Sequence, residues 1–387
     1  MNIVLTGGGS GGHIAPILAV AAELKRQMPS CHLTYIGQGG DDLLDVVQTN
    51  PHIDAVKTIS AGKLRRYSGE GWRQLLDLKT QALNIRDLAR TVWGIGQSYR
   101  LLRALQPNVV FTRGGFVSVP VALAARLCRV PFMTHDADSV PSLANRLIAR
   151  WAALHAVTLS PEIYPYPAAK MRMTGIPVGV HFEPVTSKLR AAYVAELGLP
   201  TDSQVVTVTG GGNGARMLNQ AIVANTRYLF SRYPKLVLLH FAGRSLEAET
   251  NAAYDALDLG QARARVKVYS FATDFYKYTG AADVVVARGG MGSLAELAMQ
   301  QKACIVVPSK QLRWNVQNSR VLAKKQAIYE LTEDQAEQPE RLGRAVEELL
   351  ENKARQTQLG QALGAIARPE AAKDLAKILL ELGASKQ

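Results

Sequence analysis

The feature that most constrains this sequence is a glycine-rich loop that follows a short apolar strand and opens a helix, and that occurs twice. The two loops occupy residues 6–13 and 209–216, and glycine pairs at 114–115 and 289–290 also follow short apolar runs. Backbone N–H groups and the positive end of the helix converge at such a loop, so phosphate or diphosphate is its natural ligand. One loop of this kind is often only a tight turn. Four glycine segments after strands indicate binding sites. Each exposed glycine weakens a fold, so four such segments need a functional reason.

Short β-rich runs alternate with longer helical patterns, which is the rhythm of a parallel sheet covered by helices. The runs expected as strands are 3–5, 32–36, 109–111, 205–209, 236–241, 266–269, 284–287 and 305–307. The pattern stops at the Gly-Ile-Pro-Val-Gly segment 175–179. We therefore expect an α/β protein with two doubly wound domains, over residues 1–175 and 180–365, and a cleft between them. A final helix over about 369–387 has an apolar face that needs a surface to cover.

Composition agrees with two domains and points to an acidic partner. The chain has 387 residues, of which 47% are hydrophobic, enough for two sizeable cores. Its formal net charge is +13 and its pI is about 9.7. Nucleic acid, an anionic lipid surface and a phosphorylated substrate are each compatible with that charge. Charge alone does not choose among them.

Cysteine usage and hydropathy indicate the compartment. Three cysteines, Cys31, Cys128 and Cys304, lie far apart without metal-ligand spacing, so neither a disulfide framework nor a zinc site is expected. No signal peptide pattern opens the sequence, and the apolar run 116–133 is interrupted by Arg126 and Arg129. We expect a protein of the reducing cytoplasm that does not span a membrane but can lie on one.

The segment 63–103 combines many basic residues with aromatic and aliphatic ones, Trp72 and Trp93 among them. Basic residues beside exposed aromatics suit an anionic bilayer. The alternative is an ordinary helix whose apolar side packs on the core and whose basic side is solvated. That core face would consist of Leu88, Val92, Ile95 and Tyr99. Both interpretations stay open on sequence alone.

Several segments together resemble the MurG family of glycosyltransferases, family 28, over nearly the whole chain. Residues 8–13 resemble the GGTGGH loop of that family, and 114–120 its GGYxSxP segment. Residues 135–145 resemble HEQNxxPGLTN, 211–219 resemble GGSQGARxLN, and 288–296 resemble the donor motif RAGALTVAE. Their order and spacing agree throughout, which makes the set far more specific than any one loop.

The resemblance implies a GT-B fold, with two Rossmann-like domains whose parallel sheets face each other across a cleft and a last helix that returns to the first domain. It implies inverting transfer of N-acetylglucosamine from UDP-GlcNAc to the muramyl C4 hydroxyl of lipid I, undecaprenyl-diphospho-MurNAc-pentapeptide, giving lipid II. That step belongs to peptidoglycan synthesis and cell wall biogenesis, and so to cell shape, the cell cycle and cell division. The protein would lie peripherally on the cytoplasmic face of the cell membrane, with other cell-wall synthesis proteins as potential partners.

The resemblance also assigns the donor site to the second domain. Glu296 would hold the ribose hydroxyls, Arg288 and Ser293 would lie beside the phosphates, and uracil would be read by backbone groups around Ala272. Residues implied to bind UDP-GlcNAc are Asp138, Gly211, Gly212, Asn213, Gly214, Ala272, Arg288, Met291, Gly292, Ser293, Glu296, Asn315 and Asn318.

The acceptor site is implied to lie in the first domain. The acceptor diphosphate would rest on Gly8, Gly9, Ser10, Gly11, Gly12, Gly114 and Gly115. An inverting transfer needs a base for the acceptor hydroxyl and stabilisation of the departing diphosphate. His13 is the first candidate for that base, and Asp138 can share or take the role. His13 can equally bind the acceptor diphosphate.

Some residues depart from the family motifs. Asp136 and Asp138 replace Glu and Asn, and they form a D-x-D sequence that binds metal in a different glycosyltransferase fold; we interpret it as coincidence. Gly212 replaces a Ser and Gly179 an Arg, so two phosphate contacts are missing, and Trp314 changes the sugar-reading segment. The resemblance implies that no cofactor or metal site is required, and leaves open whether a divalent metal affects the reaction.

Other functions remain in competition. A glycolipid synthase of the same fold would transfer sugar to diacylglycerol, which has no diphosphate to occupy the loop at residues 8–13. A UDP-GlcNAc 2-epimerase would need no lipid-docking segment, and a non-catalytic protein would bind UDP-sugar without turnover. Nucleic acid is not expected as a partner, because no recognition helix or aromatic-basic platform for single strands is present.

Overall fold

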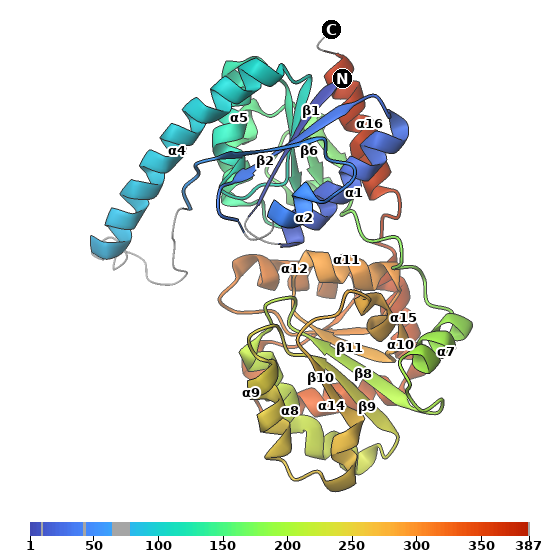
Figure 1. Ribbon diagram of the computed structural model, residues 1–387. Coiled ribbons are helices and arrows are strands. Elements are labelled where there is room, and N and C mark those ends of the chain that lie inside the picture. Colours follow the sequence, from blue (N-terminus) through green and yellow to red (C-terminus); the bar gives the residue numbers. More distant parts are fainter. Residues whose placement is uncertain (9–10, 42–43, 64–77, 386–387) are drawn as a thin grey trace. The chain divides into compact units, whose positions relative to one another are not determined.

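The computed structural model describes residues 1–8, 11–41, 44–63 and 78–385, and for residues 11–13 and 78–79 the backbone alone. The chain divides into two compact units (Figure 1). The first consists of Met1–Val178 together with Arg368–Gln387, and the second of Gly179–Ala367. The dividing point follows the Gly-Ile-Pro-Val segment at which the sequence pattern stops.

The first unit is built on a seven-stranded parallel sheet in the order β3-β2-β1-β4-β5-β6-β7. Its strands are β1 (Asn2–Thr6), β2 (His32–Gln38), β3 (Ala55–Ile59), β4 (Val109–Thr112), β5 (Phe132–Asp136), β6 (Leu154–Val157) and β7 (Met171–Met173). Its helices are α1 (Gly11–Gln27), α2 (Leu44–Gln48), α4 (Leu78–Leu105), α5 (Ser118–Leu127), α6 (Leu143–Ile148) and α16 (Ala371–Ala384). Short 3-10 turns occupy Ala149–Trp151, Pro161–Ile163 and Ala168–Lys170.

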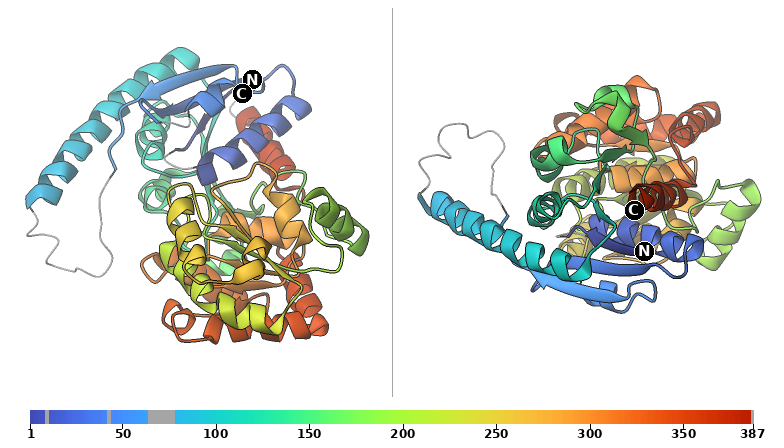
Figure 2. Two further views of the ribbon diagram at one scale, coloured as in Figure 1. Left: turned by 60° about the horizontal axis from the view of Figure 1, so that its bottom comes forward. Right: turned by 90° about the horizontal axis from the view of Figure 1, so that it is seen from above.

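Helices cover both faces of this sheet, which is why its strands are apolar without alternation. Successive residues of β1 point to opposite faces: Ile3 and Leu5 join the core under α1 and α16, and Val4 joins the core under α4 and α5. Helix α16 packs against α1, so the end of the chain returns to the first unit. The two termini accordingly lie close together (Figure 2).

The second unit contains a six-stranded parallel sheet in the order β10-β9-β8-β11-β12-β13. Its strands are β8 (Gln204–Thr209), β9 (Leu236–Phe241), β10 (Val266–Tyr269), β11 (Val284–Ala287), β12 (Cys304–Val306) and β13 (Tyr329–Glu330). Its helices are α7 (Ser187–Glu196), α8 (Arg216–Arg232), α9 (Glu247–Asp255), α10 (Phe275–Ala281), α11 (Met291–Met299), α12 (Arg313–Lys324), α13 (Glu333–Ala336), α14 (Arg341–Glu351) and α15 (Lys353–Gly364), with a 3-10 turn at Gly260–Arg265.

Both sheets are doubly wound, as the sequence predicts. In the first, the chain runs outward from β1 to β3 and then returns to β4 on the other side of β1; in the second, it runs from β8 to β10 and returns to β11. Ligands bind at such a switch point, outside the carboxyl ends of the two central strands. The loops at 6–13 and 114–115 follow the two central strands at the first switch point, and those at 209–216 and 289–290 follow the two central strands at the second.

Helix α4 contradicts the expectation of an apolar core face. Through most of its length the buried side is small or polar and includes Thr80, Asp87, Gly94 and Ser98, while near its end the buried Leu102 joins the core. Gly94 lies so close to the backbone of the segment after β3 that an added Cβ would be 1.9 Å from the Ser60 carbonyl oxygen. Of the four predicted core residues, Leu88 and Val92 are 58% and 61% exposed, Tyr99 is also exposed, and Ile95 is half-buried. The apolar side of α4 therefore faces away from the core of the first unit.

Candidate functional site

A cavity of about 270 Å³ opens at the switch point of the second sheet. Its lining residues are Thr209, Gly210, Gly211, Gly214, Ala215, Arg288, Gly290, Ser293, Ser309, Leu312 and Asn315. They come from the carboxyl ends of β8, β11 and β12 and from the starts of the helices that follow these strands. The cavity thus lies where a doubly wound sheet binds its ligand.

Three helices begin at this cavity without a side-chain cap. The N-cap residues of α8, α11 and α12 are Ala215, Gly290 and Leu312, and none of them makes a side-chain cap hydrogen bond. All three line the cavity. Elsewhere in the same unit, Thr186, Thr332 and Asn352 do cap α7, α13 and α15. First-turn N–H groups that no side chain caps, at three positive helix ends, make the cavity suited to a diphosphate.

The glycines of the 209–216 loop are required for different reasons. Gly214 has φ +74°, and a Cβ there would lie 1.9 Å from the Ala242 carbonyl oxygen. A Cβ on Gly210 would meet the Ala215 backbone nitrogen at 2.4 Å. Gly212 has no atom within 4 Å of an added Cβ, so its position can accept a side chain. The Ser of the family motif is therefore missing here without a steric reason.

A buried polar network supports this loop from behind. Asn219, on α8, donates from Nδ2 to the Ala242 carbonyl oxygen at 3.0 Å, and its Oδ1 lies 3.0 Å from Nε2 of His240. The other ring nitrogen of His240 lies 2.8 Å from the Tyr254 hydroxyl. Burial lowers the pKa of His240 to about 3, which keeps the ring neutral. The network fixes the turn after β9 on which Gly214 packs.

Arg288 brings a fixed positive charge to the cavity. Its Nη1 atom lies 2.7 Å from Oε1 of Glu333 and donates to the Val307 carbonyl oxygen at 2.9 Å. Burial lowers the pKa of Arg288, while the charge of Glu333 acts in the opposite direction. Both bonds use Nη1, so the guanidinium is anchored on the side of α13. It is thereby oriented to meet an anion in the cavity.

Glu296, the predicted ribose ligand, lies on α11 one turn beyond Ser293. Its side chain is half-buried, and desolvation raises its pKa to about 7. It does not line the cavity itself. A carboxylate with this environment gains stabilisation if hydroxyl groups donate hydrogen bonds to it.

The two predicted asparagines of α12 have different positions. Asn315 lines the cavity. Asn318 is fully buried and donates from Nδ2 to the Gly289 carbonyl oxygen at 2.9 Å. It therefore holds the loop after β11, and its assignment as a sugar-reading side chain stays a prediction. The backbone of Gly289 also packs closely against α12, because an added Cβ there would lie 2.5 Å from the Asn315 carbonyl oxygen.

The remaining predicted donor residues lie around the cavity rather than in its lining. The Met291 side chain is buried in the core, so only its backbone N–H at the start of α11 is free to face a ligand. Gly292 follows it in the first turn, and Gly212 and Asn213 lie at the exposed tip of their loop. Ala272 follows β10, two strands away from β8.

An aromatic-cationic pair marks the region near Ala272. The side chain of Phe271 is 50% exposed, and the guanidinium of Arg244 lies 4.9 Å from the centre of its ring. Arg244 follows β9, and Phe271 follows β10, so both lie at the carboxyl edge of the sheet. A flat ring and a planar guanidinium at this edge form a surface suited to a nucleobase.

In the first unit, glycines allow two switch-point loops to touch. Gly114 and Gly115 have φ +84° and +82°, and a Cβ on Gly115 would lie 2.9 Å from the Gly8 carbonyl oxygen. The Ser118 hydroxyl donates to the Gly114 carbonyl oxygen at 2.5 Å and fixes this turn. Gly8, Gly114 and Gly115 are thus brought together, as expected for one anion site.

Other predicted acceptor residues fall partly outside the described structure. Gly9 and Ser10 lie outside the described residues, as does Trp72. Gly11, Gly12 and His13 form the first turn of α1, where the backbone is described and the side chains are not. The role of His13 stays a prediction from sequence, with its backbone at the N-terminus of a helix that leaves the switch point.

Asp136, the first residue of the D-x-D sequence, is committed to structure. It is buried, its Oδ1 accepts from the Ser142 backbone N–H and from Asn145 Nδ2, and its Oδ2 accepts from the Tyr166 hydroxyl at 2.7 Å. Burial raises its pKa, and these donors act against that rise. Asp138 is only half-buried. Within the described residues no group of three or more His, Cys, Asp or Glu side chains is placed to hold a metal ion.

Sequence reasoning missed part of the lining of the cavity. Ser309 and Leu312 were not predicted, whereas Thr209, Gly210 and Ala215 belong to the predicted loop 209–216 and Gly290 to the predicted glycine pair 289–290. The signal for Ser309 was available, because it follows the apolar run 305–307 at the carboxyl end of a strand. No motif marks Leu312, whose importance depends on where α12 begins.

Comparison with known proteins matches two domains of one family to successive parts of the chain. Residues 3–157 match the model of the glycosyltransferase family 28 N-terminal domain, and residues 205–377 match that of the family 28 C-terminal domain. A crystal structure of MurG from Acinetobacter baumannii has a TM-score of 0.75 and 20% identity, over 98% of this chain and 99% of that one. That structure has the GT-B fold, which the two doubly wound units of this chain share.

Curated relatives extend over the whole chain. Two of them carry the name UDP-N-acetylglucosamine--N-acetylmuramyl-(pentapeptide) pyrophosphoryl-undecaprenol N-acetylglucosamine transferase. The protein from Desulforudis audaxviator is 30% identical over 394 residues, covering 99% of this chain and 98% of the relative. The protein from Caldicellulosiruptor saccharolyticus is 29% identical over 385 residues, covering 98% of each.

Proposed function

The chain belongs to glycosyltransferase family 28, as a divergent member related to MurG, and from this premise we propose that it transfers N-acetylglucosamine from UDP-GlcNAc to lipid I. The product is lipid II, the disaccharide precursor of peptidoglycan. The acceptor atom is the muramyl C4 hydroxyl oxygen, and the anomeric carbon is inverted. The chain covers nearly the full length of the relatives named for this transfer.

The observation that carries the donor assignment is the meeting of three uncapped helix N-termini and Arg288 at one cavity. The diphosphate of UDP-GlcNAc occupies this cavity, where backbone N–H groups of the 209–216 loop and of α11 donate to its oxygens. The ribose hydroxyls donate to Glu296, and uracil lies against the surface of Arg244 and Phe271, near the backbone of Ala272. Ser293 supplies a hydroxyl beside the phosphates.

The same groups serve the chemical step. As the bond between the anomeric carbon and the β-phosphate breaks, negative charge grows on the leaving diphosphate. The helix ends and Arg288 are already fixed in place, so they stabilise this charge without reorganising. His13 takes the proton from the acceptor hydroxyl, which attacks the anomeric carbon directly, so that no covalent enzyme intermediate forms.

The acceptor binds the first unit. Its diphosphate rests on the loop formed by Gly8, Gly114 and Gly115, at the start of α1. The close approach of these glycines leaves backbone groups in front of the phosphates. A diacylglycerol acceptor has no diphosphate for this site.

The transfer is tested with purified protein, UDP-GlcNAc labelled in the sugar, and a short-chain lipid I analogue. We expect labelled lipid II analogue and UDP in equal amounts. A matched acceptor without the diphosphate should give no product. Binding of UDP-GlcNAc without any product would contradict the proposal and favour a non-catalytic UDP-sugar-binding protein. Product with diacylglycerol in place of the lipid I analogue would instead favour a glycolipid synthase.

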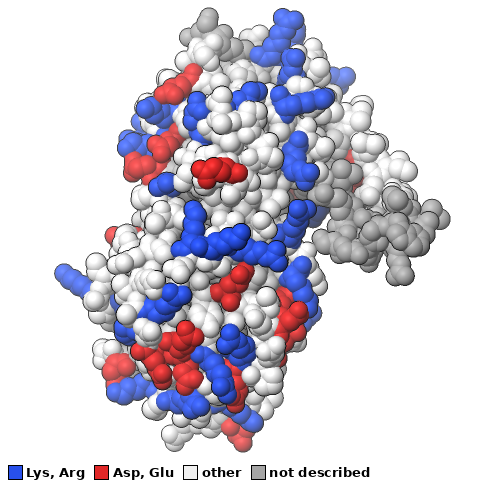
Figure 3. All heavy atoms as spheres, turned by 180° about the vertical axis from the view of Figure 1, so that it is seen from behind, with Lys and Arg blue, Asp and Glu red and all other residues white. Residues whose placement is uncertain are grey.

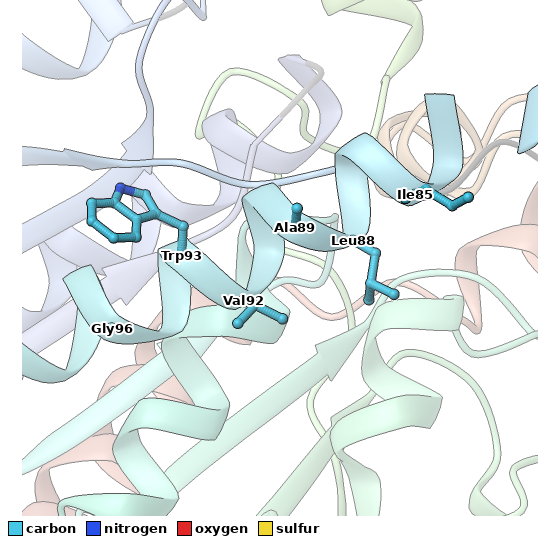
Figure 4. A pocket seen from close by; sticks show the side chains of 6 residues that line it. All are labelled: Ile85, Leu88, Ala89, Val92, Trp93 and Gly96. Carbon is cyan, nitrogen blue, oxygen red and sulfur yellow. The ribbon is translucent and has the colours of Figure 1, made fainter. Parts of the chain in front are cut away.

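We also propose that the apolar side of α4 docks on an anionic membrane surface, which places the protein peripherally on the cytoplasmic face of the cell membrane. Ile85, Leu88, Ala89, Val92, Trp93 and Gly96 line a surface hollow of about 490 Å³ on this helix. Figure 4 shows Leu88 and Val92 projecting from the same side of α4. In the described part of the chain no helix has both the length and the apolar character needed to cross a membrane.

Charge on α4 favours an anionic lipid over a neutral one. Arg86 and Arg90 are 48% and 51% exposed beside this apolar side, and Arg100 and Arg103 are exposed further along the helix. Basic residues around buried aromatic and aliphatic ones are typical of interfacial helices. Lys and Arg also lie over both units on the face drawn in Figure 3, with acidic residues among them.

Membrane docking is tested by flotation with vesicles of phosphatidylglycerol and phosphatidylcholine. The Leu88→Glu/Val92→Glu variant should bind vesicles at least about tenfold more weakly, because two charged side chains replace apolar ones that the bilayer would otherwise bury. Leu127→Glu is the control, since Leu127 is 64% exposed on α5 of the same unit. Equal binding of the α4 variant and the wild type would contradict the proposed docking surface. Binding should also weaken as salt is raised.

A further inference from the structure

We propose that His135 is a positioning residue, a neutral imidazole that joins the glycine loop of the acceptor site to the segment through which the chain leaves the first unit. This inference rests on the proposed transfer and deepens it, because it identifies what holds the acceptor loop in place. Two hydrogen bonds carry it, one at each nitrogen of the ring.

The two ring nitrogens of His135 have opposite hydrogen-bond roles. Nδ1 lies 2.7 Å from Nη1 of Arg113, and because a guanidinium only donates, Nδ1 is the acceptor. Nε2 lies 2.8 Å from the Gly175 carbonyl oxygen, which only accepts, so Nε2 carries the proton and donates. A ring that makes both bonds at once is the neutral Nε2–H tautomer, because a charged imidazolium has a proton on each nitrogen.

The ring of His135 joins the ends of three neighbouring strands. His135 lies on β5 and is fully buried. The ladder between β4 and β5 places Arg113, which follows β4, level with His135. On the other side, the Gly175 backbone N–H donates to the carbonyl oxygen of Val157, the last residue of β6, at 3.3 Å. Buried hydrogen bonds of this kind are costly to lose, so the ring restrains the residues on both sides of it.

On the β4 side, His135 holds the acceptor loop. Arg113 directly precedes the glycine pair 114–115. The His135 carbonyl oxygen accepts from Asn145 Nδ2 at 3.1 Å. The same asparagine packs against the loop, since an added Cβ on Gly114 would lie 3.3 Å from its Oδ1. A shift of His135 would therefore displace the glycines of the proposed diphosphate site.

On the other side, His135 holds the place where the chain leaves the first unit and returns to it. The first unit ends at Val178 and resumes at Arg368. Gly175 has φ +78°, and an added Cβ there would lie 2.5 Å from the Cβ of Arg368. The outgoing and returning segments thus pack together at the residue whose carbonyl oxygen His135 bonds. One buried side chain connects the acceptor loop to this place.

The test compares two buried histidines of the full chain by hydrogen–deuterium exchange. His135→Phe keeps a ring in place and removes both bonds. We expect exchange at 113–116 and at 174–176 to rise at least about tenfold, because the two segments lose their common anchor. His155→Phe is the control, since His155 is 1% exposed on the neighbouring β6 and lies 2.7 Å from the Thr134 hydroxyl. It should leave exchange at both segments within about twofold of wild type, whatever its effect on Tm.

Kinetics with UDP-GlcNAc and the lipid I analogue separate positioning from general stability. His135→Phe should lower kcat at least about tenfold, because a displaced acceptor is badly oriented for attack. Its affinity for UDP-GlcNAc should change less than about twofold, since the donor cavity is built from residues of the second unit. His155→Phe should keep kcat within about twofold of wild type. Equal losses of kcat in the two variants would overturn the proposal and leave His135 a general structural role.

A second variant keeps the test available if His135→Phe does not fold. Arg113→Met removes only the bond to Nδ1, so exchange should rise at 113–116 and stay near the wild-type rate at 174–176. Nitrogen NMR of protein labelled in its histidines reads the tautomer of His135 directly. Nε2 should be protonated and Nδ1 unprotonated in the wild type, and the Nδ1 signal should shift in Arg113→Met.

A protonated Nδ1 in the wild type, or unchanged exchange at 113–116 in both His135→Phe and Arg113→Met, would overturn the proposal. Exchange and NMR need no substrate. Absence of turnover in the wild type would therefore count against the proposed transfer, and not against the bonds that His135 makes.

Discussion

Arg288 and Glu333 form an ion pair of 2.7 Å at the edge of the diphosphate cavity, with side chains that are only 13% and 7% exposed. The second oxygen of Glu333 accepts the backbone N–H of Lys310 at 3.1 Å. One carboxylate thus joins the cationic side chain after β11 to the loop after β12. Arg288 is held in place before any ligand binds, and its charge is directed rather than mobile.

Replacement of Arg288 by Lys should therefore weaken binding of UDP-GlcNAc at least about tenfold, although the charge is kept. An ammonium group that bonds Glu333 and Val307 keeps one N–H on the same nitrogen, whereas the guanidinium makes both bonds through Nη1 and keeps Nη2 and Nε as further donors. Isothermal titration calorimetry measures this change. Arg344→Lys is the control, because Arg344 is exposed on α14 of the same unit and forms an ion pair with Glu340, the N-cap residue of that helix. Unchanged affinity in Arg288→Lys would show that Arg288 does not contact the diphosphate.

Affinity for UDP-GlcNAc should depend on pH through Glu296. Its pKa is raised to about 7, and ribose hydroxyls need the carboxylate as acceptor, so affinity should be full above pH 7 and fall as the pH drops below it. Titrations from about pH 5.5 to about pH 8.5 test this, and the diphosphate diester of UDP-GlcNAc does not itself titrate in that range. Glu296→Gln should bind more weakly and with little pH dependence. The same slope in both proteins would exclude Glu296 as the titrating group.

The free protein should show the opposite effect on stability. Because burial raises the pKa of Glu296 in the folded state, folding takes up a proton between about pH 4.5 and about pH 7, and stability from this group is lost as the pH rises through that window. Glu296→Gln should therefore raise Tm at pH 8 and have little effect at pH 4.5. Differential scanning calorimetry at the two pH values measures it. A variant that is less stable than wild type at pH 8 would contradict this prediction.

Gly214→Ala and Gly212→Ala should differ sharply although they change the same loop. The first places a Cβ 1.9 Å from the Ala242 carbonyl oxygen at a φ of +74°, which should cost at least about 3 kcal/mol of unfolding free energy and abolish UDP-GlcNAc binding. The second places a Cβ in open space and should change stability by less than about 0.5 kcal/mol. Urea denaturation gives both values. Similar values for the two variants would mean that the loop is not held as described.

His13→Ala should lower kcat by about a hundredfold to ten-thousandfold and leave the KM for UDP-GlcNAc nearly unchanged, because a general base acts on the acceptor hydroxyl and not on the donor. Steady-state kinetics with the lipid I analogue measure both constants. His52→Ala is the control, since His52 lies on the turn before β3, away from the switch point. A rise in KM for the acceptor at unchanged kcat would assign His13 to binding of the acceptor diphosphate instead.

Much of the fold follows from local sequence. The apolar runs at 236–241, 266–269 and 284–287 are the observed strands β9, β10 and β11, and the final apolar helix does return to the first unit. The strands that were missed are short or mixed in character. Met171–Met173 contains an arginine, and Ala55–Ile59 is an edge strand with exposed Lys57. Such strands form because a neighbouring strand offers hydrogen bonds, which no local pattern reveals.

Among the predicted donor residues, too, local sequence places some correctly and cannot place others. Gly211, Gly214, Arg288, Ser293 and Asn315 follow strand ends or lie in helix starts, and the structure gathers them around one cavity. Asn318 belongs to the same motif, but it points inward and bonds Gly289. Both asparagines are buried on α12, and what separates them is that Asn315 lines the cavity whereas Asn318 bonds the loop after β11.

The sequence by itself determined the two doubly wound sheets, the glycine loops after their first strands and membership of a glycosyltransferase family, because strand and helix periodicity and glycine spacing are properties of neighbouring residues. Strand packing was needed to show that three uncapped helices begin at one cavity, that Arg113 is buried against His135, and that most of α4 turns small and polar residues inward. These depend on strand order and on which surfaces are covered. Those are relations between segments far apart in the chain, and no local pattern contains them.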